Sequence, residues 1–417
     1  MATDRENYVN LFKSIFKDSV SFSDIKKTVP EEERSFFNML FMSAFRQLTF
    51  IKTVVLPQFV KKKIPHKNEI LNFIFYLATT ELLFLDKPDY AVINSYVDIA
   101  KSKTDKFGGN FVNAVLRNIL RNRTLLLEKH NQKFFSADFL KILKQDYTPI
   151  EIEEMEHFAG IEAPLDLTFK YSAHPSIDNA ILLPTGSIRL PANTKITSLD
   201  DFQEGNCWAQ DAASAIPVKC LGELKGKKVL DICAAPGGKT AQLLDARATV
   251  TAVDISEKRL VKLKENIERL GLSKNLNTLC YNALDLDINE KFDVILLDAP
   301  CSATGTFRRH PEIMNTKTIE DVKKQADLQR KILKHCAKFL KSNGLIVYAT
   351  CSLAKAEGEK QIKTFVKECP DFCVVPIKLK GTEKMQTKEG FLRILPQHLG
   401  EFSGIDGFFV TVLKRKI

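Results

Sequence analysis

The second half of the chain alternates apolar strand-like runs with amphipathic helical segments, and this alternation constrains the fold more than any other feature. Parallel strands joined by helices form a doubly wound sheet, whose ligands bind at the carboxyl ends of the strands. We therefore predict an α/β domain over residues 221–417. Its strands are expected at residues 228–233, 249–254, 277–281, 292–298, 344–351 and 408–413, with helices at 257–270 and 319–340.

The first 135 residues lack this alternation and predict an all-α domain. Apolar residues recur at helical spacing in residues 10–16 and 36–45, and residues 70–85 are apolar nearly all round, as expected of a central helix. Residues 136–220 begin as a polar, acidic helical connector and continue as short segments broken by prolines, which predicts a small α+β middle subdomain. The fold class is therefore multidomain.

Cysteine usage and hydropathy exclude several classes of protein. The nine cysteines all lie between Cys207 and Cys373, and this odd number is unlike a disulfide framework. Cys369 and Cys373 form no zinc pattern with a nearby histidine, so we expect no metal. The chain starts without a signal peptide, and its most apolar run, Ile70–Leu85, contains Glu81 and does not predict a membrane span. We expect a cytoplasmic monomer.

Basic residues give the chain a net charge of +10 and gather in two clusters. Such clusters bind nucleic acids because Lys and Arg contacts to phosphates release counterions. The alternative is that they are solvated helix faces. Few aromatic residues interleave them, which favours backbone contact over base reading. The clusters are Lys61, Lys62, Lys63 and Lys67, and Lys101, Lys103, Lys106, Arg117, Arg121, Arg123, Lys129 and Lys133.

A glycine-rich loop, Cys233-Ala-Ala-Pro-Gly-Gly-Lys-Thr240, follows the first strand of the α/β domain. Its last three residues, Gly-Lys-Thr, also occur in the P-loop of nucleoside triphosphatases. That motif requires glycine where Cys233 stands, and Pro236 removes a backbone donor from a phosphate cradle. The dinucleotide fingerprint G-x-G-x-x-G is absent as well. The loop therefore admits a ligand close to the backbone without holding phosphates.

Carboxylates follow the next three strands. An acidic residue at the end of the second strand binds ribose hydroxyls in such sheets, which assigns that role to Asp254. Asp285 and Asp298 follow the third and fourth strands. Three carboxylates without a phosphate cradle suit S-adenosylmethionine, a cationic ligand with a ribose and no phosphate. The alternative is that Asp254 or Asp285 only caps the next helix. We expect a Rossmann-like methyltransferase domain.

Two thiols belong to the same strand ends. Cys301 follows the fourth strand and Cys351 ends the fifth. A lone cysteine is usually a small buried hydrophobe, but two thiols beside this loop suit methylation of pyrimidine C5. A thiolate adds to C6, which activates C5 toward the sulfonium methyl, and a carboxyl near N3 balances the charge. A base then removes the C5 proton so that the thiolate leaves. A base inside a duplex must first be flipped out.

Three motifs resemble one known family closely. They are residues 233–240, Asp-Ala-Pro-Cys-Ser-Ala-Thr-Gly-Thr-Phe-Arg-Arg-His-Pro-Glu at 298–312, and Tyr-Ala-Thr-Cys-Ser-Leu at 348–353. They are similar to those of the RNA 5-methylcytosine methyltransferases. The helical domain, residues 1–135, is similar to the NusB antitermination factor. Together they resemble bacterial methyltransferases of 16S ribosomal RNA over essentially the whole chain.

The resemblance implies a role for each candidate site residue. Cys351 would be the nucleophile on C6, Cys301 would assist proton removal and product release, and Asp298 would lie between cofactor and cytosine. Lys239 would lie near the reacting centre, as a fourth catalytic residue. Cofactor binding would fall to Cys233, Ala234, Ala235, Pro236, Gly237, Gly238 and Lys239 around the methionine part, Asp254 at the ribose, Asp285 at the adenine, Asp298 and Arg259.

The same resemblance brings two further segments to the site. Gln210 and Asp211 would approach from the middle subdomain, and Arg308, Arg309 and His310 would face the RNA. For the three basic residues a solvated patch is the alternative.

The chain departs from the family pattern in two places. Glu357-Gly-Glu359 stands where the family often has Glu-Asn-Glu, and Met314-Asn315 stands where an aromatic residue is usual. Both put local contacts in doubt, and neither removes a catalytic group. We predict an S-adenosylmethionine-dependent cytosine-C5 methyltransferase of 16S ribosomal RNA or an early small-subunit particle. The alternatives are the same chemistry on transfer RNA, an N-methyltransferase, and a non-catalytic RNA-binding ribosome-assembly factor.

Overall fold

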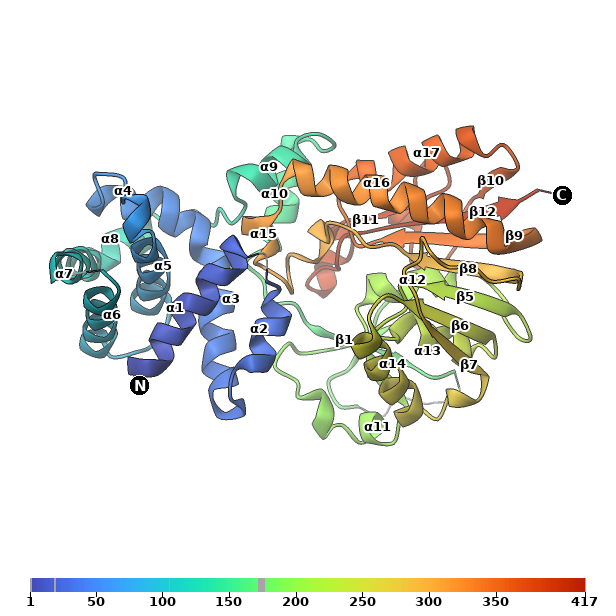
Figure 1. Ribbon diagram of the computed structural model, residues 1–417, viewed down its shortest axis with the longest axis horizontal. Helices are drawn as coiled ribbons and strands as arrows, with labels where there is room; N and C mark the ends of the chain where they lie inside the picture. Colours follow the sequence, from blue (N-terminus) through green and yellow to red (C-terminus); the bar gives the residue numbers. More distant parts are fainter. Residues whose placement is uncertain (1, 19, 105, 172–176, 417) are drawn as a thin grey trace. The chain divides into compact units, whose positions relative to one another are not determined.

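The chain folds into two compact units, one made mainly of its N-terminal residues. The structure, a computed structural model, describes residues 2–18, 20–104, 106–171 and 177–416 (Figure 1). The first unit contains Met1–Leu140 and His310–Thr316, and the second contains Lys141–Arg309 and Lys317–Ile417. The short segment His310–Thr316 therefore belongs with the N-terminal helices, although the chain on both sides of it belongs to the second unit.

The first unit is helical, as the sequence predicts. Its core is rich in aromatic side chains, such as Phe12 stacked on Phe45 with ring centroids 4.8 Å apart. Glu81 interrupts the apolar central helix because it is buried between Arg5, at 2.7 Å, and the hydroxyl of Tyr96, at 2.8 Å. The helices are α1 (Ala2–Lys17), α2 (Phe22–Thr28), α3 (Arg34–Phe50), α4 (Leu56–Phe59), α5 (Ile70–Phe84), α6 (Asp89–Lys103), α7 (Lys106–Arg121), α8 (Arg123–Glu128) and α15 (Ile313–Thr316).

One helical stretch, Glu31–Phe59, is long and apolar enough to cross a membrane on length and composition alone. The sequence analysis, which considered only Ile70–Leu85, missed it. In the structure its side chains Phe37, Phe41 and Phe45 are fully buried in the core of the first unit. The stretch thus serves as a core helix, because a helix buried by its neighbours needs the same apolar composition as a helix in lipid.

A mixed sheet forms the centre of the second unit, in the order β10-β12-β9-β8-β5-β6-β7. The strands from β9 to β7 are parallel, as predicted, whereas β12 runs antiparallel to both of its neighbours, β9 and the edge strand β10. The strands are β5 (Lys228–Ile232), β6 (Thr249–Asp254), β7 (Leu276–Cys280), β8 (Phe292–Asp298), β9 (Leu340–Thr350), β10 (Phe372–Val375) and β12 (Phe408–Arg415), with β11 (Leu392–Ile394) paired to β12.

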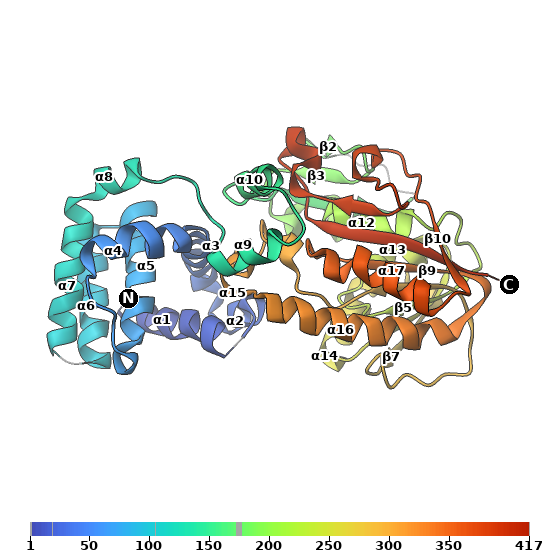
Figure 2. The same ribbon diagram turned by 90° about the horizontal axis from the view of Figure 1, so that it is seen from above.

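Helices cover both faces of this sheet (Figures 1 and 2). Alternate residues of a strand point to opposite faces, so Val229 packs with one layer and Leu230 with the other. One layer consists of α12 (Ala212–Lys219), α13 (Gly238–Asp245) and α14 (Glu257–Arg269), and the other of α16 (Ile319–Cys336) and α17 (Glu359–Glu368). This three-layer arrangement confirms the predicted Rossmann-like class and leaves the carboxyl ends of the strands for a ligand.

The residues before β5 form a second, antiparallel sheet in the order β2-β3-β1-β4. The buried ion pair between Arg189 of β3 and Asp166 of β1, 2.6 Å long, joins its central strands. Residues 172–176 of this segment lie outside the described residues. The elements are β1 (Leu165–Phe169), β2 (Ile181–Leu182), β3 (Ile188–Leu190) and β4 (Cys207–Ala209), with α11 (Asp200–Gln203) before β4.

Two helices precede that sheet, α9 (Ala137–Leu143) and α10 (Pro149–His157). Their acidic composition predicts a polar connector, yet their apolar face is buried, including Ile152 and Met155. Between them, the hydroxyl of Tyr147 donates a 2.7 Å hydrogen bond to the carbonyl of Leu353, two residues after Cys351. Even an acidic residue of this segment, Glu156, is buried, so the segment is packed structure that supports a site loop.

Candidate functional site

The glycine-rich loop connects the end of β5 to the first turn of α13. Gly237 has a φ of 103°, which favours glycine, and a Cβ atom there would lie 2.9 Å from Cγ of Leu263 in α14. Cys233 also adopts the left-handed region, with a φ of 63°, which is uncommon for a residue with a side chain. The loop thus holds its backbone in an unusual conformation against α14, as sites for ligands often do.

A cleft of about 400 Å³ opens beside this loop, within the second unit. The predicted residues Cys233 to Lys239, Asp298, Gln210, Asp211 and Arg309 all contribute to its wall, which confirms that the fold brings these distant segments together. The wall also contains residues that sequence reasoning did not select, namely Trp208, Ser214, Asp231, Asn266 and Arg269.

Lys239 and Asp298 form the charged centre of the cleft. The ammonium group of Lys239 lies 2.8 Å from Oδ2 of Asp298 and 2.8 Å from Oγ of Ser214. The lysine side chain is almost completely buried, whereas the aspartate side chain keeps about a third of its surface exposed. The pair therefore leaves a carboxylate, already balanced by one cation, on the accessible wall of the cleft. Ser214 carries no motif and was found only from the contact.

Asp231, within β5, is a buried acid behind the loop. Its Oδ2 accepts a 2.6 Å hydrogen bond from the hydroxyl of Thr240, in the first half of α13. Burial, together with the nearby carboxylates of Asp298 and Asp254, raises the pKa of Asp231 to about 7, although the Thr240 hydrogen bond and Lys239 lower it. This carboxyl therefore titrates near neutral pH.

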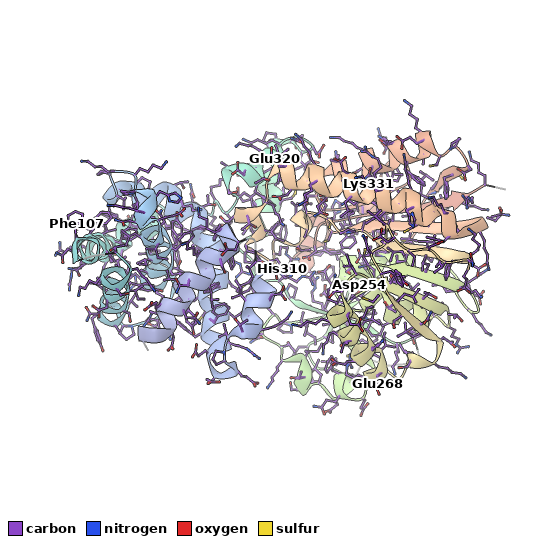
Figure 3. All side chains as sticks on the ribbon, in the orientation of Figure 1. Phe107, Asp254, Glu268, His310, Glu320 and Lys331 are labelled. Carbon is purple, nitrogen blue, oxygen red and sulfur yellow. The ribbon has the colours of Figure 1, made fainter. Side chains whose placement is uncertain are left out.

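The three remaining cofactor candidates stand outside the described wall of the cleft. Asp254, at the end of β6 (Figure 3), accepts backbone N–H groups of Ala235 at 3.2 Å and Ser256 at 3.1 Å. Arg259 lies 3.4 Å from Oδ2 of Asp254 and also donates to the carbonyl of Ala235. Both residues hold the glycine-rich loop in place. Asp285 is exposed and accepts a 2.9 Å hydrogen bond from Asn282.

The two candidate thiols meet at the ends of β8 and β9. The Sγ atoms of Cys301 and Cys351 are 3.3 Å apart and share a hydrogen bond. That hydrogen bond and burial raise the pKa of Cys301 well above its ordinary value, so Cys301 keeps its proton. The arrangement places a protonated thiol beside a second sulfur, which suits a proton-transfer group beside a nucleophile.

One known family matches most of the N-terminal part of the first unit, and another matches most of the second unit. A family model described as 16S rRNA methyltransferase RsmB/F matches residues 218–414, and the NusB family matches residues 2–121. Ribosomal RNA small subunit methyltransferase B of Vibrio cholerae is 32% identical over 85% of this chain and 83% of its own. The chain belongs to the 16S rRNA methyltransferase RsmB/F family. The corresponding protein of Vibrio vulnificus is 29% identical over 95% of both chains.

Solved structures support the same fold. The crystal structure of PH0851 covers 94% of this chain and 93% of its own, with a TM-score of 0.75 and 23% sequence identity. Membership in the RsmB/F family confirms an S-adenosylmethionine-dependent methyltransferase that modifies ribosomal RNA, and the NusB match confirms the expected type of helical domain. Among the described residues no group of three or more His, Cys, Asp or Glu side chains is arranged to hold a metal.

A buried glutamate that the sequence analysis did not select joins the two cysteine loops. Glu357 is fully buried, and its Oε2 accepts hydrogen bonds of 2.5 Å from the hydroxyls of both Ser302 and Ser352. Its Oε1 accepts from the backbone N–H of Ser302 and from Gln329, both at 2.9 Å. Each serine directly follows one of the cysteines. Glu357 therefore fixes both thiol-bearing loops relative to each other.

The departure from the RsmB/F pattern at Gly358 has a steric reason. A Cβ at this position would lie 2.6 Å from Nη2 of Arg393 and 2.8 Å from Cγ of Phe409. Arg393 occupies that space because it forms a buried pair with Glu359 through hydrogen bonds of 3.0 and 2.6 Å. A side chain at position 358 would therefore have to displace Arg393 or Phe409 in this chain. The doubt about local contacts at Glu357-Gly-Glu359 is resolved, since both glutamates make buried contacts.

The three basic residues that were expected to face RNA differ in their exposure to solvent. The prediction is wrong for Arg308, which is fully buried and donates to the carbonyl of Ser403. Arg309 is partly exposed, lines the cleft and pairs with Asp406. His310 belongs to the first unit and keeps 45% of its side chain exposed. Consecutive basic residues suggest a surface patch in the sequence, but the first of these lies in the protein interior.

Proposed function

We propose that the protein forms 5-methylcytosine in 16S ribosomal RNA through a covalent adduct between Cys351 and C6 of the target base. The contact between the Sγ atoms of Cys351 and Cys301 carries this proposal. In the reaction, the Cys351 thiolate bonds to C6, and C5 bonds to the methyl group as the bond from that methyl to the sulfonium sulfur breaks. Cys301 takes up the C5 proton and passes its own thiol proton to the sulfur of Cys351, with which it is in contact. The C5 electrons then restore the ring double bond and the C6–Sγ bond breaks. RsmB/F membership supports the substrate.

The cofactor assignment rests on the chemistry of the cleft wall. S-adenosylmethionine supplies a methyl group on a sulfonium cation. The loop from Cys233 to Lys239 offers close backbone contact to its methionine part, and the Asp298 carboxylate offers an anion toward the sulfonium. We assign Asp254 to the ribose and Asp285 to the adenine. Arg259 supports the loop, because it donates to Ala235 inside that loop.

The Lys239–Asp298 pair has two roles in this proposal. Asp298 lies between cofactor and cytosine, where its carboxyl group balances charge at N3 while the thiolate adds to C6. Lys239 holds the Asp298 side chain in position through its 2.8 Å contact. Because Ser214 takes another donor of the same ammonium group, the lysine is held from both sides.

We also propose that residues 1–135 form an RNA-binding domain, residues 136–220 a supporting subdomain, and residues 221–417 the catalytic domain. In this scheme Arg309 and His310 contact the RNA near the target base. The protein acts as a cytoplasmic monomer on 16S ribosomal RNA or on an early small-subunit particle. Basic residues on the helical unit, such as Arg117 and Arg121, give it the charge that phosphate binding requires.

The test is methyl transfer from labelled S-adenosylmethionine to unmodified 16S RNA, with the product digested to nucleosides. The wild-type protein is compared with Cys351→Ala and with Cys373→Ala, a control cysteine on edge strand β10. Label in 5-methylcytidine from the wild type and the control, and none from Cys351→Ala, is the expected result.

Other results have distinct meanings in the same assay. Label that persists with Cys351→Ala overturns the assignment of the nucleophile. Label in a different nucleoside overturns the C5 chemistry. If the wild type modifies transfer RNA in place of 16S RNA, the substrate assignment is wrong while the cysteine chemistry stands. If the wild type leaves naked 16S RNA unmodified, a parallel reaction with a small-subunit particle shows whether the protein requires the particle or is inactive.

A further inference from the structure

The first unit contains a second large cavity, which none of the predicted catalytic or cofactor-binding residues lines. It has a volume of about 680 Å³ and lies between the end of α4, the loop that follows, and α5. Pockets of about 300–1,000 Å³ are typical of small-molecule and cofactor sites. We call it the lysine cleft, and its wall includes Lys52, Lys61, Lys62, Lys63, Glu69 and Tyr76.

Cations dominate the rim of the lysine cleft. Lys61, Lys62 and Lys63 are consecutive in the loop after α4, and all three are exposed. On the wall, the ammonium group of Lys52 lies 5.1 Å from the ring centroid of Tyr76 and 5.3 Å from that of Phe16. Burial lowers the pKa of Lys52, whereas the aromatic rings favour its charged form. The rim therefore presents several positive charges to one opening.

The acid in the wall does not cancel this charge. Glu69 forms an ion pair of 2.5 Å with Lys17, and that lysine lowers the pKa of Glu69 below its usual value. The carboxylate is thus already balanced by a cation from α1. The field in the lysine cleft is therefore set by its lysines, which favours an anionic ligand.

The remaining wall is mainly apolar, and the neutral hydrogen-bond donors in it include Tyr76. Leu56, Val60 and Ile64 surround the opening, and Phe75 lies deeper. Burial, with a smaller contribution from Glu69, raises the pKa of Tyr76 to about 12, so its phenol stays protonated at neutral pH. A protonated phenol donates a hydrogen bond to a phosphate oxygen. The cleft thus combines an apolar wall with a cationic rim. These two surfaces are complementary to the base and to the anionic phosphate of a nucleotide.

We propose that the lysine cleft binds one nucleotide of a single-stranded segment of the substrate RNA. The phosphates lie along Lys61, Lys62 and Lys63, and the base or ribose lies against the apolar wall. Three consecutive lysines at the rim suit successive phosphates of a strand, whereas a free nucleotide has its phosphates at one end only. This inference rests on the proposed function, because it assumes that the protein binds RNA.

The test measures binding of the full-length protein to a labelled single-stranded RNA of about 12 nucleotides, over a series of salt concentrations. The variant Lys61→Gln/Lys62→Gln/Lys63→Gln is compared with Lys323→Gln/Lys324→Gln/Lys331→Gln. The control removes the same charge from exposed positions of α16 (Lys331 is labelled in Figure 3). Single-strand binding falls with salt with a slope of about −0.7 per phosphate contact, so losing three contacts reduces the slope by about 2.

The expected result is this reduced slope for the loop variant and an unchanged slope for the control. Equal slopes for both variants overturn the proposal, and so does a wild-type preference for AMP over the RNA strand, which indicates a free nucleotide. Tyr76→Phe is a second test that keeps the ring: loss of the phosphate donor weakens RNA binding about 2- to 13-fold, the equivalent of one hydrogen bond. Unchanged binding overturns the role of the phenol.

Methyl transfer is measured in parallel, so that failure here is distinct from failure of the proposed function. At saturating RNA, the loop variant should methylate at the wild-type rate, with only its KM raised. If the wild type binds the RNA strand but forms no 5-methylcytidine, the proposed function fails and the lysine cleft stands.

Discussion

The Sγ atoms of Cys301 and Cys351 lie 3.3 Å apart across two parallel strands, although 50 residues separate them in the chain. The register of β8 and β9 explains this, because Asp298 pairs with Ala349, β8 ends three residues before Cys301 and β9 ends directly before Cys351. A disulfide requires about 2.05 Å between the sulfurs. Both residues are therefore free thiols, and each is available for a separate step.

Replacing Cys301 tests the division of labour between the two thiols. In Cys301→Ala, the nucleophile Cys351 still adds to C6, but removal of the C5 proton is impaired. Turnover should fall by about 10²–10⁴-fold, the usual contribution of a general acid–base group. A covalent protein–RNA complex should accumulate and be visible on a denaturing gel. The double variant with Cys351→Ala should show no complex, and a complex that persists in it would mean another nucleophile.

Glu357 should matter for both stability and rate, since it accepts hydrogen bonds from both cysteine loops. Glu357→Gln replaces an acceptor oxygen with an NH₂ group that faces donors, so one buried donor loses its partner. We expect the free energy of unfolding in urea to fall by about 1.5–3 kcal/mol. The exposed residue Glu320 of α16 (Figure 3) is the control. Glu320→Gln should change the free energy of unfolding by less than about 0.5 kcal/mol.

The same variant distinguishes positioning from a purely structural role. A positioning role predicts a lower kcat for folded Glu357→Gln at a temperature well below its unfolding transition, with the Kd for S-adenosylmethionine unchanged. A wild-type kcat in the folded variant would show that Glu357 only stabilises the fold.

Lys239 should contribute more to kcat/KM than Ser214, although the two side chains are hydrogen-bonded to each other beside Asp298. Lys239→Met removes the cation that holds Asp298. We expect kcat/KM to fall about 10- to 150-fold, the equivalent of one hydrogen bond to a charged group. Ser214→Ala removes a neutral partner, and a loss of about 2- to 13-fold is expected. Steady-state kinetics of methyl transfer measure both, and the reverse order of effects would place the important contact at Ser214.

The sequence predicted those parts of the fold and site that depend on local pattern. Strand–helix alternation predicted the sheet, and the strand-end rule placed Lys239, Asp298 and the thiols at one edge of it. This works because the carboxyl ends of parallel strands meet whatever the loops between them contain. The apolar run at Ile70–Leu85 predicted the central helix of the first unit for a similar reason, since burial on all sides needs apolar residues on all sides.

Other features escaped because they depend on contacts between distant residues. Glu357 looks like a surface glutamate until Ser302, 55 residues away, donates to it. Arg308 looks like part of a basic patch until its side chain is found inside the core. Tyr147 looks like part of a polar connector until its hydroxyl donates to the carbonyl of Leu353, about 200 residues later in the chain. In each case the local sequence is compatible with both a surface and a buried position, and tertiary packing determines which of the two is adopted.

Asp231 should make stability depend on pH near neutrality. Its pKa is about 7 in the folded protein and about 3.8 when unfolded, so between these values the folded state binds the extra proton. Stability then falls as pH rises from about 4 to 7, by at most about 4 kcal/mol from this group. In Asp231→Asn, which preserves an acceptor for Thr240, that contribution disappears. Urea unfolding at pH 5 and pH 8 should therefore show a smaller decrease for the variant than for the wild type. Equal decreases in both proteins would mean that Asp231 stays ionised in the folded state.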